Sequence, residues 1–197
     1  MLYLNEHEVG FDPDGIGFPS ISGCHAIVYV TDKGLFGYHN AGGSANDKWA
    51  VRAGAFAQYY NGHFLRGGSG RRLYGTSYVD GNRGYSLPAQ TSWKGELLEF
   101  AGQLAYGGKI RGFNLSKSGV ASSAYVEYRK VGEKCEIWIK HWSDADRTLG
   151  AVASRLNHKI VVTRGGVDVT IEDVPRQVVT AVATAGLQHV HSERLRG

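Results

Sequence analysis

Short apolar runs separated by polar turns occur along most of the chain, and two longer stretches carry apolar residues at helical spacing. The sharpest pattern joins the apolar runs 26–30 and 35–38 through a polar turn at 31–34. Two such runs joined by turn residues predict an antiparallel hairpin. Asp32 and Lys33 are expected to form a two-residue loop, which sets how the two strands pair.

Cys24 stands at the open end of this hairpin, and His39 closes its second strand. With a two-residue loop, Thr31 pairs with Gly34 and His39 lies opposite Ala26, one diagonal step from Cys24. Residues two apart on a strand share a face, as do residues directly opposite each other, so the thiol and the imidazole are expected on one face. A loop with an odd number of residues would place them on opposite faces. A thiol and an imidazole within reach of each other suggest a cysteine hydrolase.

Two stretches predict helices, because their aromatic and aliphatic residues recur at helical spacing. The first spans 49–64, with Asn46 or Asp47 as its N-cap. The second spans 93–104 and is expected to be capped by Ser92.

The remaining apolar runs predict strands, and a loop rich in Gly, Asp and Pro is expected at 10–19. Strands are expected at 2–4, 72–79, 109–115, 124–130, 135–142, 159–163, 167–172 and, with strand favoured over helix, 178–190. Strands and helices do not alternate, so the fold class is α/β, a layered sandwich of mixed or antiparallel β-sheets flanked by about two main helices. No interdomain linker is visible, and a single catalytic domain is expected over 1–197.

Composition and charge narrow the classes of partner. The 197 residues, 42% of them hydrophobic, suffice for one buried core. The net charge of +4 is spread out, apart from small concentrations at 71–72 and 194–196, so no nucleic-acid partner is expected, while an acidic protein surface stays open. No apolar stretch reaches the length of about 18 residues that a membrane span needs. The start of the chain lacks the features of a secretory signal peptide.

The two cysteines are too few for a disulfide scaffold. Cys135 alternates with Ile137 and Ile139 along one strand face, where a small buried hydrophobe is expected. The eight histidines lack the spacing of zinc ligands, so no metal is expected, and the Gly-rich loop after residue 66 lacks the rest of a phosphate-binding motif.

Chemistry at Cys24 needs a base and an oxyanion donor. A nearby imidazole raises the thiolate fraction of a cysteine and later returns the proton to the leaving group. Gly23 gives substrate access to the backbone, and the amide N–H of Cys24 is a natural oxyanion donor. His25 is a weaker base candidate than His39, because neighbouring strand residues point to opposite faces. A third group that fixes the histidine tautomer is expected among Ser20, Ser22, Asn40 or a backbone carbonyl.

The segment Ile21-Ser22-Gly23-Cys24, followed by a histidine fifteen residues later, resembles the Leu-Ser-Gly-Cys…His signature of bacterial glutamine-deamidating toxins. These include the catalytic domain of cytotoxic necrotizing factor and Burkholderia lethal factor, and the chemoreceptor glutamine deamidases share the same logic. The resemblance covers residues 17–43 and implies a layered α/β sandwich. It implies Cys24 as nucleophile and His39 as base, with Ser22 and Gly23 shaping the pocket and the oxyanion site.

One departure from the family concerns the third group. In the lethal-factor-like and chemotaxis enzymes a threonine six residues before the cysteine completes the site, and here that position holds Phe18. The necrotizing-factor type orients its histidine with a backbone carbonyl instead. The resemblance therefore implies the backbone carbonyl of Phe18, or else Ser20, as the orienting group.

The activity that the resemblance implies is protein-glutamine deamidation without a cofactor, by a bacterial toxin or virulence effector. The partner is a target protein with a reactive glutamine, and the chain is expected to be a monomer. It would be secreted without an N-terminal signal peptide and act in the target-cell cytoplasm. Two alternatives stay open, which are another Cys-His hydrolase (a peptidase, amidase or transglutaminase) and a non-catalytic β-rich binding module.

Overall fold

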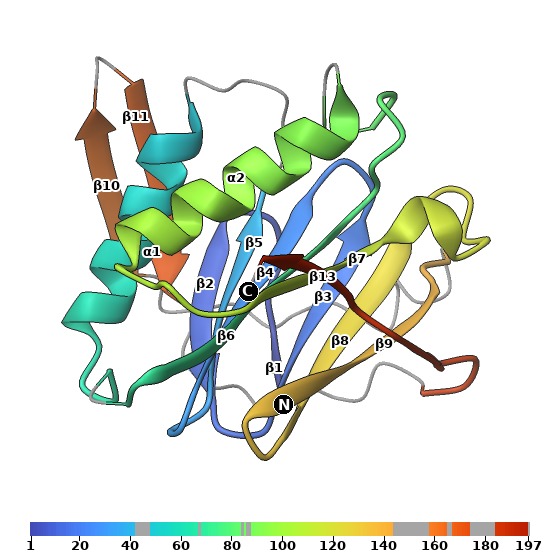
Figure 1. Ribbon diagram of the computed structural model, residues 1–197, viewed down its shortest axis with the longest axis horizontal. Helices are drawn as coiled ribbons and strands as arrows, with labels where there is room; N and C mark the ends of the chain where they lie inside the picture. Colours follow the sequence, from blue (N-terminus) through green and yellow to red (C-terminus); the bar gives the residue numbers. More distant parts are fainter. Residues whose placement is uncertain are drawn as a thin grey trace.

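The computed structural model describes residues 1–41, 48–66, 68–83, 85, 88–143, 158–164, 167–173 and 184–196, with the backbone alone at 158–164 and 167–173. These residues form three layers, which are a pair of helices, a larger β-sheet and a smaller β-sheet (Figure 1). Each sheet contains both parallel and antiparallel neighbours. The predicted layered α/β sandwich of mixed sheets with two main helices is therefore confirmed.

The helices lie side by side on one face of the larger sheet (Figure 1). Helix α1 spans Trp49–Gly62, close to the predicted range. The expected caps at 46 and 47 lie outside the described residues, and Lys48 takes the N-cap position without a side-chain hydrogen bond. Helix α2 spans Ala89–Gln103 and begins earlier than predicted. Pro88 takes the N-cap position in an extended conformation, and the amide of Ser92 already donates to its carbonyl, so Ser92 is not the cap. Neither helix has the length and hydropathy of a membrane span, as judged on the described residues.

The larger sheet is built around the predicted hairpin. Its strands, in spatial order, are β10 (His158–Arg164), β11 (Val167–Asp173), β2 (Glu8–Asp12), β5 (Leu35–Asn40), β4 (His25–Thr31), β6 (Gly70–Ser77), β7 (Ile110–Asn114) and β13 (Glu193–Arg196). Strands β6 and β7 run parallel because α2 provides the crossover between them.

The smaller sheet packs against the face of the larger sheet that the helices leave free (Figure 1). Its strands, in spatial order, are β1 (Leu2–Tyr3), β3 (Gly15–Ile21), β8 (Ala124–Val131), β9 (Lys134–His141) and β12 (Gln188–Val190). Strand β1 is parallel to β3, and the other neighbours are antiparallel.

Burial on both faces explains the unbroken apolar run of β4. Ile27 and Tyr29 pack under the helices, whereas Ala26 and Val28 pack against the smaller sheet. A strand buried on both sides reads as a continuous apolar run rather than an alternating one. On the neighbouring strand, a Cβ at Gly37 would lie only 2.7 Å from the Ile16 side chain and 2.9 Å from that of Leu4. The two sheets approach this closely because position 37 carries no side chain.

The predicted loop at 10–19 is wrong, because most of this range belongs to β2 and β3. The turn between them is closed by the Asp12 carboxylate, which accepts hydrogen bonds from the amides of Asp14 and Gly15 at 2.8 and 3.0 Å. Gly, Asp and Pro indicate a loop by composition, but here they serve a two-residue turn and a tightly packed strand.

The C-terminal region agrees only in part with expectation. Of the predicted strand 178–190, residues 178–183 lie outside the described residues, and strand structure is observed at β12. Strand β13 was not expected, since its short and mostly charged sequence lacks an apolar run. The other predicted strands occur within a few residues of their expected bounds.

The register of the β4–β5 hairpin confirms the expected pairing. Ala26 lies opposite His39, and the amide of Thr31 donates to the carbonyl of Gly34 at 2.8 Å. The loop therefore consists of Asp32 and Lys33.

Candidate functional site

Cys24 and His39 lie on the same side of the hairpin, facing the smaller sheet. Cys24 belongs to the apolar cluster between the two sheets, together with Ala26, the residue opposite His39. The ring of Phe18, in the same cluster, meets the His39 ring edge-on with centroids 5.9 Å apart. Cys24 is 8% exposed and His39 2% exposed, so the thiol lies at the edge of the core and the imidazole just inside it.

The backbone carbonyl of Leu4 orients His39. Its oxygen lies 2.7 Å from Nδ1, and because a carbonyl oxygen only accepts, Nδ1 carries the proton. Nε2 therefore presents its lone pair, and it has no hydrogen-bond partner among the described residues. The amide of Leu4 donates to the carbonyl of Gly17 at 2.9 Å, which fixes the carbonyl of Leu4 in place. In this state the thiol of Cys24 is not hydrogen-bonded to the imidazole.

A backbone carbonyl orients His39, as one of the expected alternatives had it, but it belongs to Leu4 and not to Phe18. Neither Ser20 nor the carbonyl of Phe18 supplies the hydrogen bond to His39, which comes from Leu4. Ser20 is exposed and adopts a positive φ of 60°. Phe18 contributes its ring instead of its carbonyl.

The turn after Leu4 covers the site and was missed by the sequence analysis. The amide of His7 donates to the carbonyl of His39 at 2.8 Å, so the turn is tied to β5. Glu6, at the tip of this turn, lies close enough to Cys24 for its carboxylate to raise the pKa of the thiol. The turn lies far from Cys24 and His39 along the chain, and no local motif in it indicates a role in the site.

Burial and Glu6 keep the Cys24 thiol protonated. Burial in the first place, and then the charge of the Glu6 carboxylate, raise the pKa of Cys24 to about 12, while the amide N–H of Ser22 and the charge of Arg52 act against this rise. Burial lowers the pKa of His39 to about 4, despite its hydrogen bond to the carbonyl of Leu4. The expected enrichment of thiolate is therefore not found in the free protein, and both groups are neutral near pH 7.

Ser22 and Gly23 form the bend between β3 and β4, and both are partly exposed. The amide N–H of Ser22 points close enough to the Cys24 sulfur to lower the pKa of the thiol, although burial outweighs this effect. The bend thus brings backbone N–H groups close to the position where a substrate carbonyl would react, as an oxyanion site requires.

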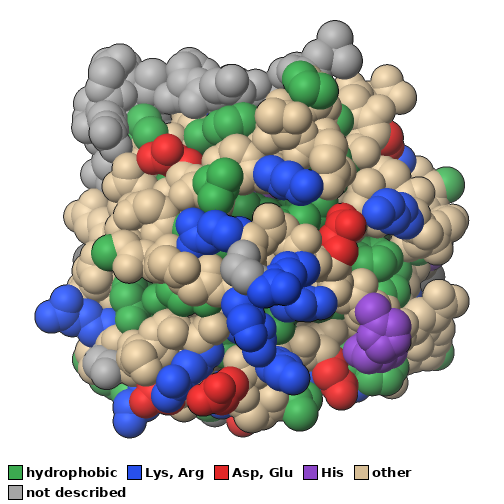
Figure 2. Space-filling view, in the orientation of Figure 1, with side chains coloured by type: hydrophobic (Ala, Val, Ile, Leu, Met, Phe, Trp, Pro, Cys, Tyr) green, Lys and Arg blue, Asp and Glu red, His purple; other side chains and the backbone are tan. Residues whose placement is uncertain are grey.

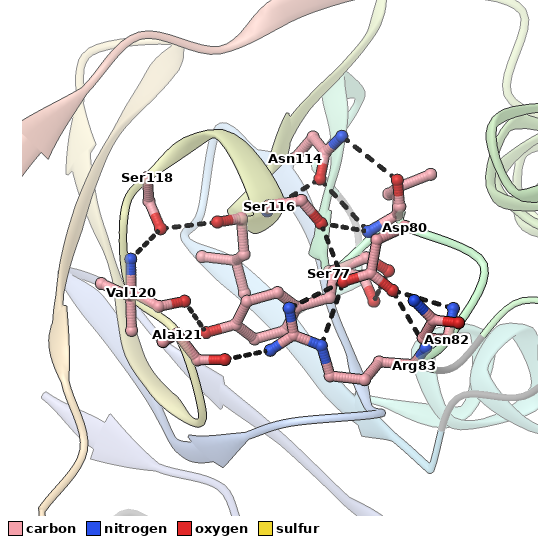
Figure 3. Close-up of polar contacts among 12 residues, drawn as sticks. Ser77, Asp80, Asn82, Arg83, Asn114, Ser116, Ser118, Val120 and Ala121 are labelled. Carbon is pink, nitrogen blue, oxygen red and sulfur yellow. Dashed lines mark hydrogen bonds and ion pairs between the residues drawn. The ribbon is translucent and has the colours of Figure 1, made fainter.

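The backbone of Cys24 is contacted by the last residue of β6. The hydroxyl of Ser77 donates to the backbone carbonyl of Cys24 at 2.8 Å. The loop that follows is held by polar contacts, among them an ion pair of 2.7 Å between Asp80 and Arg83 and a 2.6 Å hydrogen bond from Arg83 to the carbonyl of Ala121 (Figure 3). The backbone carbonyl of the candidate nucleophile is thus tied to Ser77, directly before this loop.

His25 points to the opposite face, as the alternation along a strand predicts. Its Nε2 accepts from the indole of Trp93 at 3.2 Å, and its Nδ1 lies 3.2 Å from the Glu96 carboxylate. Tyr85 donates to the same carboxylate at 2.7 Å. His25 is fully buried in this network, which excludes it as the base for Cys24.

Cys135 packs against the apolar cluster between the sheets that includes Ile137 and Ile139, but it is only partly buried, where a buried residue was expected. Both cysteines are free thiols. In the described part of the chain, no three His, Cys, Asp or Glu side chains form a group that could hold a metal ion.

No model of a known protein family matches this sequence, and no curated protein is significantly similar to it.

Replacing Glu6 with glutamine is expected to speed alkylation of Cys24 by iodoacetamide at mildly alkaline pH. The carboxylate raises the pKa of Cys24 by its charge, so its removal increases the thiolate fraction. A gain of about threefold to tenfold is expected, because burial remains and one pKa unit is tenfold in thiolate. Mass spectrometry of the labelled peptides measures the rate, with Cys135 in the same molecules as the control. An unchanged or slower rate at Cys24 would contradict this arrangement.

The folded state is expected to lose stability as the pH falls from about 6.5 to about 4. The folded pKa of His39 is lowered to about 4 from an ordinary value of 6.5, so in this window the unfolded chain binds a proton that the folded chain does not. The full shift corresponds to about 3 kcal/mol. Urea unfolding at several pH values should show this loss, and it should shrink in the His39→Gln variant but not in His189→Gln, which changes an exposed ring. An equal loss of stability at acid pH in both variants would refute the conclusion that His39 causes it.

Proposed function

We propose that this chain is a protein-glutamine deamidase, a bacterial toxin or effector that uses Cys24 as nucleophile and His39 as base. The observation that carries the proposal is the state of the imidazole. Its Nδ1 is fixed by the carbonyl of Leu4, and its Nε2, on the same face as the thiol, has no hydrogen-bond partner in the part of the chain that the structure describes. The likeness of the segment around Cys24 to the glutamine-deamidating toxins supports the choice of reaction. A backbone carbonyl on the histidine is the arrangement of the necrotizing-factor type.

The first half of the reaction forms a thioester. As the sulfur of Cys24 attacks the carboxamide carbon of a glutamine, Nε2 of His39 takes the thiol proton. The oxyanion that develops is placed near the backbone N–H groups of the bend at Ser22 and Gly23. The imidazolium then gives its proton to the departing nitrogen, and ammonia leaves.

The second half restores the enzyme. Water attacks the thioester carbon while Nε2 of His39 takes one of its protons, and the thiolate leaves and is reprotonated. The product is glutamate. An amine in place of water would give transglutamination by the same intermediate. The steps use only these side chains and backbone groups.

Limited access to the thiol favours a long, thin substrate side chain. Cys24 is only 8% exposed, and Glu6 lies beside it at the rim. A glutamine places its carboxamide at the end of two methylene groups and can reach past such a rim, whereas a backbone amide lies closer to the bulk of its own chain. We therefore favour deamidation over peptide hydrolysis. The partner is a target protein in the cytoplasm of the attacked cell, on which the chain acts as a monomer.

The proposal is tested by incubating the purified chain with a protein extract of candidate target cells. Deamidation releases ammonia and converts particular glutamines to glutamates, which peptide mass spectrometry detects without any cut in the chain. Cleaved chains would support a peptidase instead. Incorporation of an added primary amine into glutamines, without conversion of glutamine to glutamate, would support a transglutaminase. No modified residue and no ammonia in any extract would favour a binding module.

A further inference from the structure

A second site lies near the start of β6, at the opposite end of this strand from Ser77. It is a basic pocket of about 430 Å³, and five of its lining residues are cationic: Arg72, Lys109, Arg111, Lys134 and Arg194. Figure 2 shows Lys and Arg side chains gathered on this face, over the region where β13 and β6 lie in Figure 1. Nothing in the candidate site at Cys24 uses these residues.

Strand geometry explains why the cations converge. Arg72 shares a face of β6 with Tyr74, which packs between the two sheets. Arg111 is the register partner of Tyr74 on β7, so it faces the same way. The opposite wall comes from β9, where the amide of Cys135 donates to the hydroxyl of Tyr74 at 3.2 Å. The basic pocket is thus the open end of the space between the sheets.

Like charges are neighbours across the strands of this pocket. Arg111 lies directly opposite Arg194 in the β7–β13 pair. Leu73 and Ile110 are the first paired residues of β6 and β7. Arg72 and Lys109 come one residue before them, so these two cations are neighbours too. Like charges placed side by side on a sheet are destabilising. An anion in the pocket would relieve this repulsion.

The carboxylates near the pocket are engaged elsewhere. Glu133 lies 3.6 Å from Arg71, and Glu193 lies 3.5 Å from Lys117. Within the described ranges, none of the five pocket cations has an ion-pair partner, and no acidic side chain lines the pocket. The positive charge of the basic pocket is therefore uncompensated by the described side chains.

Two of the guanidinium groups in the pocket are placed so that they can bind a ligand with hydrogen bonds. Arg111 is held by Ser192, to which it donates at 2.8 Å through Nε to the hydroxyl and at 2.5 Å to the backbone carbonyl. Arg72 has a buried Nε without a hydrogen-bond partner among the described residues. A fixed guanidinium loses little freedom on binding, and its fork of donors matches the oxygens of a phosphate group.

We propose that the basic pocket binds a compact anion that carries several phosphate groups. Its volume is that of a small-molecule site, and five cations exceed what one phosphate can balance. Tyr74 is 1% exposed and offers no ring on which a base can stack, so single-stranded nucleic acid fits poorly. The phosphates can belong to a soluble polyphosphate or to the headgroup of a phosphoinositide lipid.

The basic pocket is independent of the proposed deamidase site. Arg72 and Ser77 lie five residues apart on β6, which places the two ends about 16 Å apart along the strand. Loss of one site therefore does not imply loss of the other, and binding can be measured without any enzymatic readout.

Titration calorimetry with inositol hexakisphosphate tests the proposal. The wild-type chain should bind it in a saturable manner, and the Lys109→Ala/Lys134→Ala variant should bind at least about tenfold more weakly, since both lysines are exposed and removing them leaves the fold intact. The matched control is Lys33→Ala/Lys94→Ala, which removes two exposed lysines outside the pocket and should bind like the wild type. Equal weakening in both variants, or no saturable binding to the wild type, would overturn the proposal.

Vesicles distinguish the two sources of phosphate. Co-sedimentation with vesicles that contain a phosphoinositide, but not with vesicles of equal charge made with phosphatidylserine, would assign the pocket to a lipid headgroup. Binding of free inositol hexakisphosphate without binding to either vesicle would assign it to a soluble ligand. Tighter binding of a single-stranded oligonucleotide than of the hexakisphosphate would reject the small-anion site.

Discussion

The Cys24→Ser variant is expected to lose glutamine deamidation, with a rate reduced on the order of a thousandfold or more. A serine hydroxyl is far harder to deprotonate than a thiol, and the base that must accept its proton is weak. Burial lowers the pKa of His39 to about 4, so the imidazole is a weak base. It suffices for water that attacks a reactive thioester, whereas attack of a serine hydroxyl on an unactivated carboxamide is far slower. Ammonia release and the appearance of glutamate in target peptides measure the effect.

The matched control is the same substitution at the other cysteine. Cys135 lies in β9 on the wall of the basic pocket, away from the bend at Ser22 and Gly23, so Cys135→Ser should retain activity. Circular dichroism and thermal unfolding check that both variants keep the fold. Undiminished activity of Cys24→Ser, with its fold intact, would remove the nucleophile from the mechanism.

The Glu96→Ala variant is expected to lose about 3–5 kcal/mol of folding stability, the usual cost of removing one partner of a buried ion pair. Glu96 is fully buried and holds several groups under the helices. Asn40 donates to it at 2.6 Å, and the guanidinium of Arg52 lies 3.5 Å away. Removal of the carboxylate leaves this cation and His25 without their anion in the core.

The pH dependence of this contribution has a defined sign. Burial by itself would raise the pKa of Glu96, but the hydrogen bonds from His25 and Tyr85 and the charge of Arg52 outweigh it and hold the pKa below its ordinary value. The stabilisation is therefore complete above the pKa of an unfolded glutamate, about 4.3, and is lost as the pH falls through the lower folded pKa.

Urea unfolding of the wild type and of two alanine variants tests the prediction for Glu96. Glu99→Ala, on the same helix, is the control. Its carboxylate is partly exposed and accepts a hydrogen bond from Gln103, so a change within about 0.5 kcal/mol is expected. Equal stability losses in the two variants would show that the network around Glu96 contributes no more than a surface contact.

Local pattern was sufficient for the hairpin and the placement of its reactive groups. The two-residue loop at Asp32 and Lys33 sets the register, and the register alone places Cys24 and His39 on one face. The separation of His25 from this pair follows from the same alternation. These relations connect residues close in sequence, where strand geometry leaves few choices.

The groups that complete the site depend on contacts between distant segments. The carbonyl of Leu4 reaches His39 across 35 residues, through a turn that only the packing of β1 beside β3 positions. Any residue could supply that carbonyl, so no side-chain pattern marks it. The basic pocket was equally hidden, because its cations are scattered in sequence and meet only where β6, β7, β9 and β13 come together.

The candidate site depends on Gly37, a residue that has no side chain and takes no part in the chemistry. The missing side chain lets Leu4 and Ile16 settle directly on β5, two residues before His39. A methyl group there would collide with the ends of the Leu4 and Ile16 side chains, and any repacking that shifts Leu4 would also move the carbonyl that orients the imidazole. Reactivity at Cys24 would then decline although every group that takes part in the chemistry was still present.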